Sequence, residues 1–260
     1  MSKVQVDDAG DVTTVTIDRP DVKNALDHDT MRALTEELRE IRRGDARCVV
    51  LEGAGGTFCA GADVNELMKF GGTKPPEIVE LIENDLHDII RELHRMKKPT
   101  VAKVEGHAVG AGCNLALACD LTVAEESAVF AELFARIGLS QDSGGSYVLP
   151  RLVGMKKAKE LVFTGRDVSA TEAEEIGLIN HAYPDDSFQK AADDFVDEIA
   201  SGPTKAIGAS KSLLHYGAEN DLDATLEREA WVQSSISQSD DVEEGVMAFA
   251  QGRDPEFEGK

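Results

Sequence analysis

The chain has 260 residues, with 49 acidic and 27 basic side chains and a formal net charge of −22. The acids are spread along the whole chain, which argues against nucleic-acid binding because that function needs a basic face. No apolar run reaches the roughly 20 residues needed to cross a bilayer, so no membrane partner is expected. Salt in a high-salt cytoplasm would screen the electrostatic repulsion among these acidic side chains, so the composition indicates adaptation to high salt. An ordinary acidic surface is the alternative.

The first half of the sequence predicts strands and helices that alternate. Residues 4–18 alternate apolar and polar side chains around the turn DDAGD, which predicts a hairpin. After the loop RPDVKNALD, Asp27 is expected to cap a helix over residues 28–43. The remaining expected elements are a strand at 47–54, a Gly-rich loop at 53–63, a short helix at 64–70 that GGTKPP ends, a helix at 77–96, strands at 99–106 and 121–126, and a helix between these two strands.

After residue 150 the pattern is mostly helical. The expected helical segments are 156–165, 171–178, 187–201, 203–217, 221–236 and 242–252. Strands that alternate with helices favour a layered βαβ core with parallel pairing. No low-complexity linker divides the chain, so we expect one continuous unit with a core over residues 1–200 and a helical C-terminal region over 201–260.

The four cysteines form no CxxC pair, and each lies in an apolar or Gly/Ala-rich segment: Cys48, Cys59, Cys113 and Cys119. This is typical of small buried hydrophobic residues in a reducing compartment rather than of disulfides or metal ligands. We therefore expect a cytoplasmic protein without a metal site.

Two junctions, TFCAGAD and VGAGCN, each follow a strand, carry only small residues around the turn and lead into a helix. The first N–H groups of a helix have no partner within it, and the helix dipole favours negative charge there. Two such junctions that face one another would form a two-donor oxyanion hole. The alternative is tight packing of helix on strand, which also requires glycine and alanine.

Six pieces of the chain, in order, resemble the enoyl-CoA hydratase/isomerase (crotonase) superfamily. They are RPDVKNALD, FCAGADVNEL, KKPTVAKVEGHAVGAGCNLALACDLTVA, GGSYVLPRLVG, LVFTGRDVSATEAEEIGLIN and EGVMAFAQGRDPEF. The resemblance implies an α/β fold of the ClpP/crotonase type, a spiral of ββα units with a helical C-terminal trimerisation region. It also implies a homotrimer or hexamer, an acyl-CoA thioester as substrate, and no metal or redox cofactor.

The resemblance places the oxyanion hole on the backbone N–H groups of Ala62 and Ala111. The thioester oxygen would lie about 3 Å from both donors as negative charge develops on it. Substrate binding is expected at Lys23, Ala25, Ala60, Asp63, Val64, Gly110, Leu133 and Phe134.

The sequence departs from the hydratase pattern at both expected glutamates. By spacing, the first falls on Asn114 and the second on Phe134, ten residues before Gly144. Neither side chain exchanges a proton near neutral pH. A shifted alignment would make Glu132 the missing acid instead.

Asp142 remains as a candidate base two residues before Gly144, where several isomerases of the superfamily carry an aspartate. The alternative for Asp142 is a helix N-cap. Asn114 is expected either to orient the substrate near a dienolate or to form its hydrogen bonds within its own helix. The sequence thus favours an enoyl-CoA isomerase that shifts a 3-enoyl to a 2-enoyl thioester. Two alternatives stay open: a hydratase with rearranged acids, and a non-catalytic acyl-CoA binder.

Overall fold

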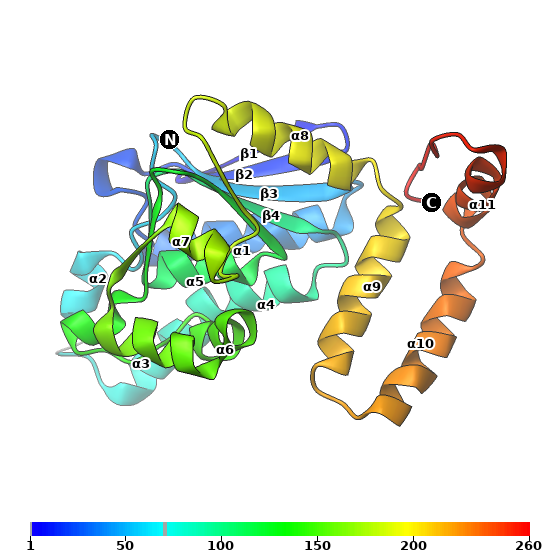
Figure 1. Ribbon diagram of the computed structural model, residues 1–260. Coiled ribbons are helices and arrows are strands. Elements are labelled where there is room, and N and C mark those ends of the chain that lie inside the picture. Colours follow the sequence, from blue (N-terminus) through cyan, green and yellow to red (C-terminus); the bar gives the residue numbers. More distant parts are fainter. Residues whose placement is uncertain (1, 70–71) are drawn as a thin grey trace.

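The computed structural model describes residues 2–69 and 72–260 and shows a layered α/β core with a helical region at one side (Figure 1). Within these residues, the main sheet has six strands in the order β1-β2-β3-β4-β6-β9. The strands are β1 (Val4–Ala9), β2 (Val12–Ile17), β3 (Cys48–Gly53), β4 (Thr100–Val104), β6 (Leu121–Glu125) and β9 (His181–Tyr183). The β1–β2 hairpin is antiparallel and the other neighbours are parallel, which confirms the predicted hairpin and parallel core.

A smaller sheet of three strands was not predicted from the sequence. It consists of β5 (His107–Val109), β7 (Val129–Ala131) and β8 (Asp167–Ser169) in the order β5-β7-β8, counted over the described residues. These strands and β9 have three residues each, which is too short for a period of two to be recognised. Pairing with neighbours from distant parts of the chain defines them instead.

Helices cover both faces of the main sheet. On one face, α8 (Phe188–Ala200) packs through Phe188, Ala192 and Val196 onto the buried valines of the strands (Figure 1). The other face is covered by three helices, α1 (His28–Arg43), α4 (His87–Arg95) and α5 (Ala111–Ala118). The side chain of Asp27 accepts a hydrogen bond from the N–H of Thr30, so its predicted capping role is confirmed.

The remaining helices agree with the sequence pattern within a few residues, except that α6 begins at Gly145, eleven residues before the predicted segment 156–165. They are α2 (Val64–Lys69), α3 (Pro75–Leu81), α6 (Gly145–Thr164), α7 (Ala170–Glu175), α9 (Thr204–Gly217), α10 (Leu222–Ile236) and α11 (Asp240–Gln251). The predicted helix over 77–96 is divided between α3 and α4 by a π-helical turn (Ile82–Leu86). The last residue of the predicted 64–70 helix and the first residue of the break after it, 70 and 71, lie outside the described residues. No helix in the described ranges is both long and apolar enough to span a membrane.

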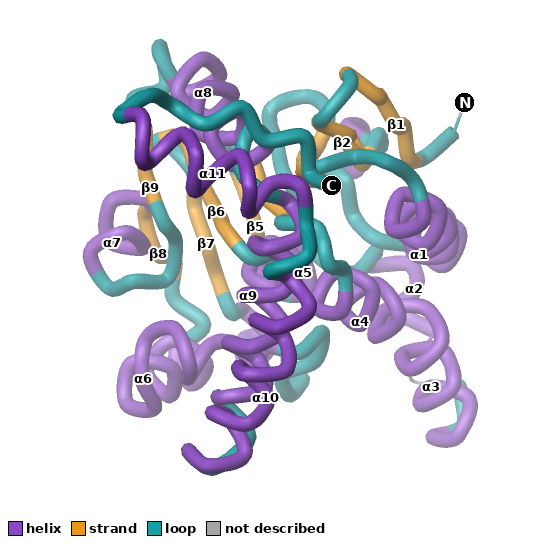
Figure 2. Tube along the Cα trace, turned by 90° about the vertical axis from the view of Figure 1, so that its right-hand side faces the viewer, coloured by secondary structure: helices purple, strands orange, loops and turns teal. Residues whose placement is uncertain are grey.

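The C-terminal region is joined to the core through α9, which lies between the core and α10 (Figures 1 and 2). The buried ammonium group of Lys211 on α9 donates to the carbonyl of Leu93 at 2.9 Å and to Asp120 at 2.7 Å. The division into a core over 1–200 and a helical region over 201–260 stays a prediction.

All four cysteines are buried and free, as the sequence predicted. Burial raises the pKa of Cys48 and Cys59 to about 12 each, so both thiols stay protonated at neutral pH. They therefore act as small apolar residues in the core.

The chain after β3 runs beside β5, and this pairing sets the geometry of the functional region. The N–H of Cys59 donates to the carbonyl of His107 at 2.9 Å, and the N–H of Val109 donates back to Cys59 at 3.0 Å. Helix α5 then begins directly against this loop. A Cβ on Gly112 would lie 2.2 Å from the carbonyl oxygen of Cys59, so any larger residue would force the two segments apart.

We expect Gly112→Ala to destabilise the fold. Alanine improves helix propensity by about 1 kcal/mol, but overpacking against a fixed backbone costs about 1–3 kcal/mol, and a contact of 2.2 Å leaves no room to relax cheaply. The free energy of unfolding, measured by urea denaturation, should fall by about 2 kcal/mol. Gly44→Ala is the control, because its Cβ would lie 3.6 Å and 3.8 Å from the nearest carbonyls. Equal unfolding midpoints for the two variants would contradict the argument.

Candidate active site

A pocket of about 520 Å³ opens where the two Gly/Ala-rich junctions, residues 57–63 and 109–114, meet. The residues predicted from the sequence that line it are Ala60, Ala62, Val64, Gly110, Ala111, Leu133, Phe134 and Asp142. Four apolar residues that sequence reasoning missed complete the wall: Leu67, Met68, Ile137 and Leu139. The pocket is therefore mostly apolar and suits an acyl group.

Two backbone N–H groups are available at this pocket. Ala111 is the first residue of α5, and its N–H has no carbonyl acceptor within the described part of the chain; the same holds for the N–H of Ala62. A Cβ on Gly61 would lie 3.4 Å from the nitrogen of Ala111, so the two junctions stand side by side. Gly61 also has a φ of +90°, a conformation that favours glycine. Two backbone N–H groups without a carbonyl acceptor in the described residues thus belong to the lining of one pocket.

Asp142 is the one ionisable residue among the described residues that line the pocket. Burial raises the pKa of its carboxyl above the usual value, while the hydroxyl of Ser143, which donates at 2.7 Å, and the nearby His87 lower it. The alternative role as a helix cap is wrong, because the N-cap of α6 is Gly144 and no side chain caps that helix. Ser143 adopts a left-handed φ of 51°, a strained backbone of the kind that clusters at functional sites.

Asn114 lies behind the pocket rather than in it. Its amide nitrogen Nδ2 donates to the carbonyl of Asp142 at 3.0 Å and to Oε1 of Gln141 at 3.2 Å. Position 114 falls on the part of α5 that packs against α6, so the side chain faces the loop before α6. The expected contact with substrate is therefore corrected, and so is the alternative of a purely local bond: Asn114 connects α5 to the loop that carries Asp142.

Glu132, the alternative acid, is also buried and lies outside the pocket lining. Its Oε2 accepts a hydrogen bond from Nε2 of Gln141 at 3.0 Å. Burial raises the pKa of Glu132 to about 7, with the charge of Asp142 as a smaller contribution in the same direction. Two carboxyl groups with raised pKa values thus lie near one another, and only Asp142 reaches the pocket.

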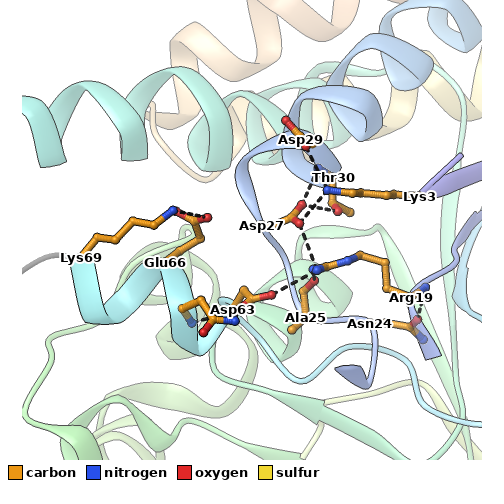
Figure 3. A network of polar contacts seen from close by, with 11 residues as sticks. Lys3, Arg19, Asn24, Ala25, Asp27, Asp29, Thr30, Asp63, Glu66 and Lys69 are labelled. Carbon is orange, nitrogen blue, oxygen red and sulfur yellow. Dashed lines mark hydrogen bonds and ion pairs between the residues drawn. The ribbon is translucent and has the colours of Figure 1, made fainter. Parts of the chain in front are cut away.

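An ion network holds the loop on the other side of the pocket (Figure 3). Arg19 bridges Asp27 at 3.0 Å and Asp63 at 3.1 Å, and it also donates to the carbonyl of Ala25. Asp63 accepts from the N–H of Asn65 at 2.9 Å, and this bond is the main cause of its lowered pKa. The carboxylate of Asp63 and the carbonyl of Ala25 are therefore engaged within the protein. Both residues hold this part of the site in place, and their expected part in substrate binding stays a prediction.

Lys23 and Asn24 follow in the same loop, and both have a positive φ, 53° and 55°. The buried side chain of Asn24 accepts from the N–H of Arg19 and donates to the carbonyls of Ala54 and Thr57. Lys23 is exposed, and its carbonyl accepts from the N–H of Ala60 at 3.0 Å. Sequence reasoning missed Arg19, Asn24 and Gln141, because their roles depend on partners up to 44 positions away.

Comparison with known proteins agrees with this geometry. A sequence profile described as enoyl-CoA hydratase/isomerase matches residues 7–260. A curated protein of Rhodobacter capsulatus named "Probable enoyl-CoA hydratase" is 38% identical, covering 96% of this chain and 95% of its own. The 1,2-epoxyphenylacetyl-CoA isomerase of Escherichia coli is 35% identical, with the same coverage of 96% and 95%.

A solved structure shows the same architecture. The crystal structure of an enoyl-CoA hydratase from Bacillus anthracis superimposes with a TM-score of 0.92 at 31% identity, covering 99% of this chain and 100% of that one. Sequence and structure therefore agree over nearly the whole chain; Ala62 and Ala111 both line the pocket, and the oxyanion hole at their N–H groups stays a prediction. The chain belongs to the enoyl-CoA hydratase/isomerase family, the crotonase superfamily, and is an enzyme of this kind.

Proposed function

We propose that this enzyme is an enoyl-CoA isomerase that converts a 3-enoyl-CoA to a 2-enoyl-CoA with Asp142 as its base. One observation carries the proposal: Asp142 is the one ionisable side chain among the described residues around a pocket that also presents two free backbone donors. Moving a double bond requires a base that removes a proton from one carbon and returns it to another. It requires no activated water.

The proposed reaction has two proton transfers. The carboxylate of Asp142 removes a proton from C2 of the 3-enoyl thioester, and the electrons move onto the thioester oxygen to form a dienolate. The N–H groups of Ala62 and Ala111 stabilise the negative charge on that oxygen. Asp142 then returns the proton to C4, which leaves the double bond between C2 and C3. The apolar wall formed by Leu133, Phe134 and Leu139 excludes water from the intermediate.

The names of relatives are compatible with isomerisation and with hydration. One relative is named an isomerase and acts on a CoA thioester, and others are named hydratases. A hydratase would need an acid in contact with water, and the candidate with a pKa near neutral, Glu132, lies outside the pocket lining. Hydration with rearranged acids is therefore the second candidate. A non-catalytic acyl-CoA binder is the third, and it would use the same pocket without turnover.

We further propose that the coenzyme A part of the substrate crosses the loop that carries Lys23 and the main chain around Ala60 and Val64. Val64 is 66% exposed at the pocket mouth, and Lys23 supplies a cation in an acidic protein. The enzyme is proposed to act as a homotrimer or hexamer. Large exposed apolar side chains on α10 and α11 support an assembly: Leu222, Leu226, Trp231, Val246 and Phe249.

Asp142→Asn should abolish isomerisation. Asparagine keeps the shape of aspartate but cannot accept a proton, so kcat for 3-hexenoyl-CoA should fall by about 10³-fold. The rise in ultraviolet absorbance of the conjugated product measures this rate, in high-salt buffer. Acyl-CoA binding by calorimetry should stay within about threefold, because the oxyanion donors are unchanged.

Asp167→Asn is the matched control, since Asp167 is an exposed aspartate paired with Arg136. Full activity of Asp142→Asn on 3-hexenoyl-CoA would rule out Asp142 as the base. A fall in absorbance when the wild type receives 2-butenoyl-CoA would identify hydration instead.

Ala111→Pro removes one oxyanion donor without inserting a bulky side chain. Ala111 is the first residue of α5, where proline is tolerated and lacks an N–H. We expect kcat to fall by about 10²-fold to 10³-fold, with little change in the melting temperature. Asp240→Pro, at the exposed first position of α11, is the control for proline itself. Unchanged kcat in Ala111→Pro would show that this N–H does not contact the reacting oxygen.

Ser143→Ala should move the acid side of the pH profile upward. The base form of Asp142 is the carboxylate, so activity is lost as the pH falls through its pKa. The hydroxyl of Ser143 donates to this carboxylate and lowers the pKa, and its removal therefore raises the pKa. The pH dependence of kcat/KM measures the shift, with the exposed Ser146→Ala as control. A shift to lower pH, or none, would contradict this assignment.

A further inference from the structure

Three polar side chains, the buried Glu132 and Asn114 and the half-buried Gln141, form a continuous hydrogen-bonded chain behind the pocket. Glu132, which follows β7, accepts from Nε2 of Gln141 at 3.0 Å. Oε1 of Gln141 accepts from Nδ2 of Asn114 on α5 at 3.2 Å. The same Nδ2 donates to the main-chain carbonyl of Asp142 at 3.0 Å. The chain thus begins at a carboxyl group outside the pocket and ends on the backbone of the proposed base.

The carboxyl at one end sets the direction of both amides. Oε2 of Glu132 accepts from Gln141, and the ionised carboxylate has no donor of its own, so in this form of Glu132 the Gln141 amide turns its NH₂ group toward Glu132 and its oxygen toward Asn114. Asn114 must then present its NH₂ group, which is the group that the carbonyl of Asp142 needs. If Gln141 were reversed, two NH₂ groups would face one another and two acceptor oxygens would lose their donor.

The surroundings leave the chain no freedom to rearrange. A Cβ on Gly145 would lie 2.4 Å from both terminal atoms of the Asn114 amide and 2.4 Å from Oε1 of Gln141. The first residue of α6 therefore packs directly on the two amides. Ser143, between this glycine pair and Asp142, holds a left-handed φ of 51°, which persists only when neighbouring contacts fix it.

A buried glutamate at this place has no explanation in packing alone. Glu132 is 3% exposed, and its Oε1 has no hydrogen-bond partner among the described residues. Burial raises its pKa to about 7, so the fold keeps an acid that is costly to ionise there. An apolar residue of similar size would avoid this cost. What an apolar residue cannot supply is the acceptor that orients Gln141.

We propose that Glu132 is a positioning residue for Asp142: through Gln141 and Asn114 it fixes the carbonyl of Asp142, and with it the loop that aims the catalytic carboxylate into the pocket. This role rests on the proposed function of Asp142. It differs from the acid role that a hydratase would give to Glu132, because no proton passes between Glu132 and the substrate.

Kinetics of four variants test the positioning role. Glu132→Leu and Gln141→Leu should each lower kcat for 3-hexenoyl-CoA by about 30-fold through misplacement of the base. KM should change by less than about twofold, because the apolar wall and the oxyanion donors stay in place. The double variant should be no slower than either single one, since both break the same chain. Glu132→Gln retains an acceptor oxygen and should keep kcat within about threefold of the wild type.

Glu105→Leu is the matched control. Glu105 is a partly buried glutamate with a raised pKa that is hydrogen-bonded to a glutamine, Gln189, and it lies outside the pocket lining. Its kcat should equal that of the wild type, and melting temperatures show whether all variants fold. Independent, additive losses in the double variant would overturn the proposal. Loss of activity in Glu132→Gln equal to that in Glu132→Leu would also overturn it and would support an acid role.

A crystal structure of Glu132→Leu tests the same chain without any assay. We expect a displaced carbonyl at Asp142, and an unchanged loop over residues 139–145 would overturn the positioning role. Asp142→Asn separates the two proposals. If Asp142→Asn stays active, the proposed base is wrong, whereas an inactive Asp142→Asn with fully active Glu132→Leu rejects only the positioning role.

Discussion

The functional region depends on a contact between two stretches of main chain, residues 58–61 and 107–111. Main-chain hydrogen bonds join them at Cys59, and glycines remove the side chains that would separate them. Because these bonds extend a sheet, they hold the N–H groups of Ala62 and Ala111 with the rigidity of regular structure rather than of a loop. Two donors fixed in this way need no reorganisation when charge develops on an oxygen atom between them.

The charge of the protein adds a second constraint. Coenzyme A carries several phosphates, and this chain has a net charge of −22. Two carboxylates, Asp27 at the start of α1 and Asp63 before α2, lie beside the segments that are proposed to bind it. Arg19 lies between them and pairs with both, so each of these two carboxylates has a cationic partner. The half-buried arginine thus offsets two acidic charges beside the proposed binding segments.

Much of the fold could be predicted from the sequence, because its long elements have clear periods and caps. The helix after Asp27 and the strand at 48–53 are examples, and the resemblance in motifs gave the positions of Ala62, Ala111 and Asp142. The short strands β5, β7, β8 and β9 could not be predicted, since pairing with distant residues defines them. The direction of the Asn114 side chain could not be predicted either, because a position in a helix does not show which other element packs against it.

The exchange of an acid for an amide at position 114 follows from the groups around it. Nδ2 of Asn114 donates two hydrogen bonds, to Gln141 and to the carbonyl of Asp142, and an ionised glutamate can donate none. A glutamate there would also place a third carboxyl group beside Glu132 and Asp142, whose pKa values burial already raises. Like charges at short range cannot all ionise in a buried site. An asparagine leaves Asp142 as the one group that carries the charge into the pocket, which is the condition for a single base to move a proton between two carbons.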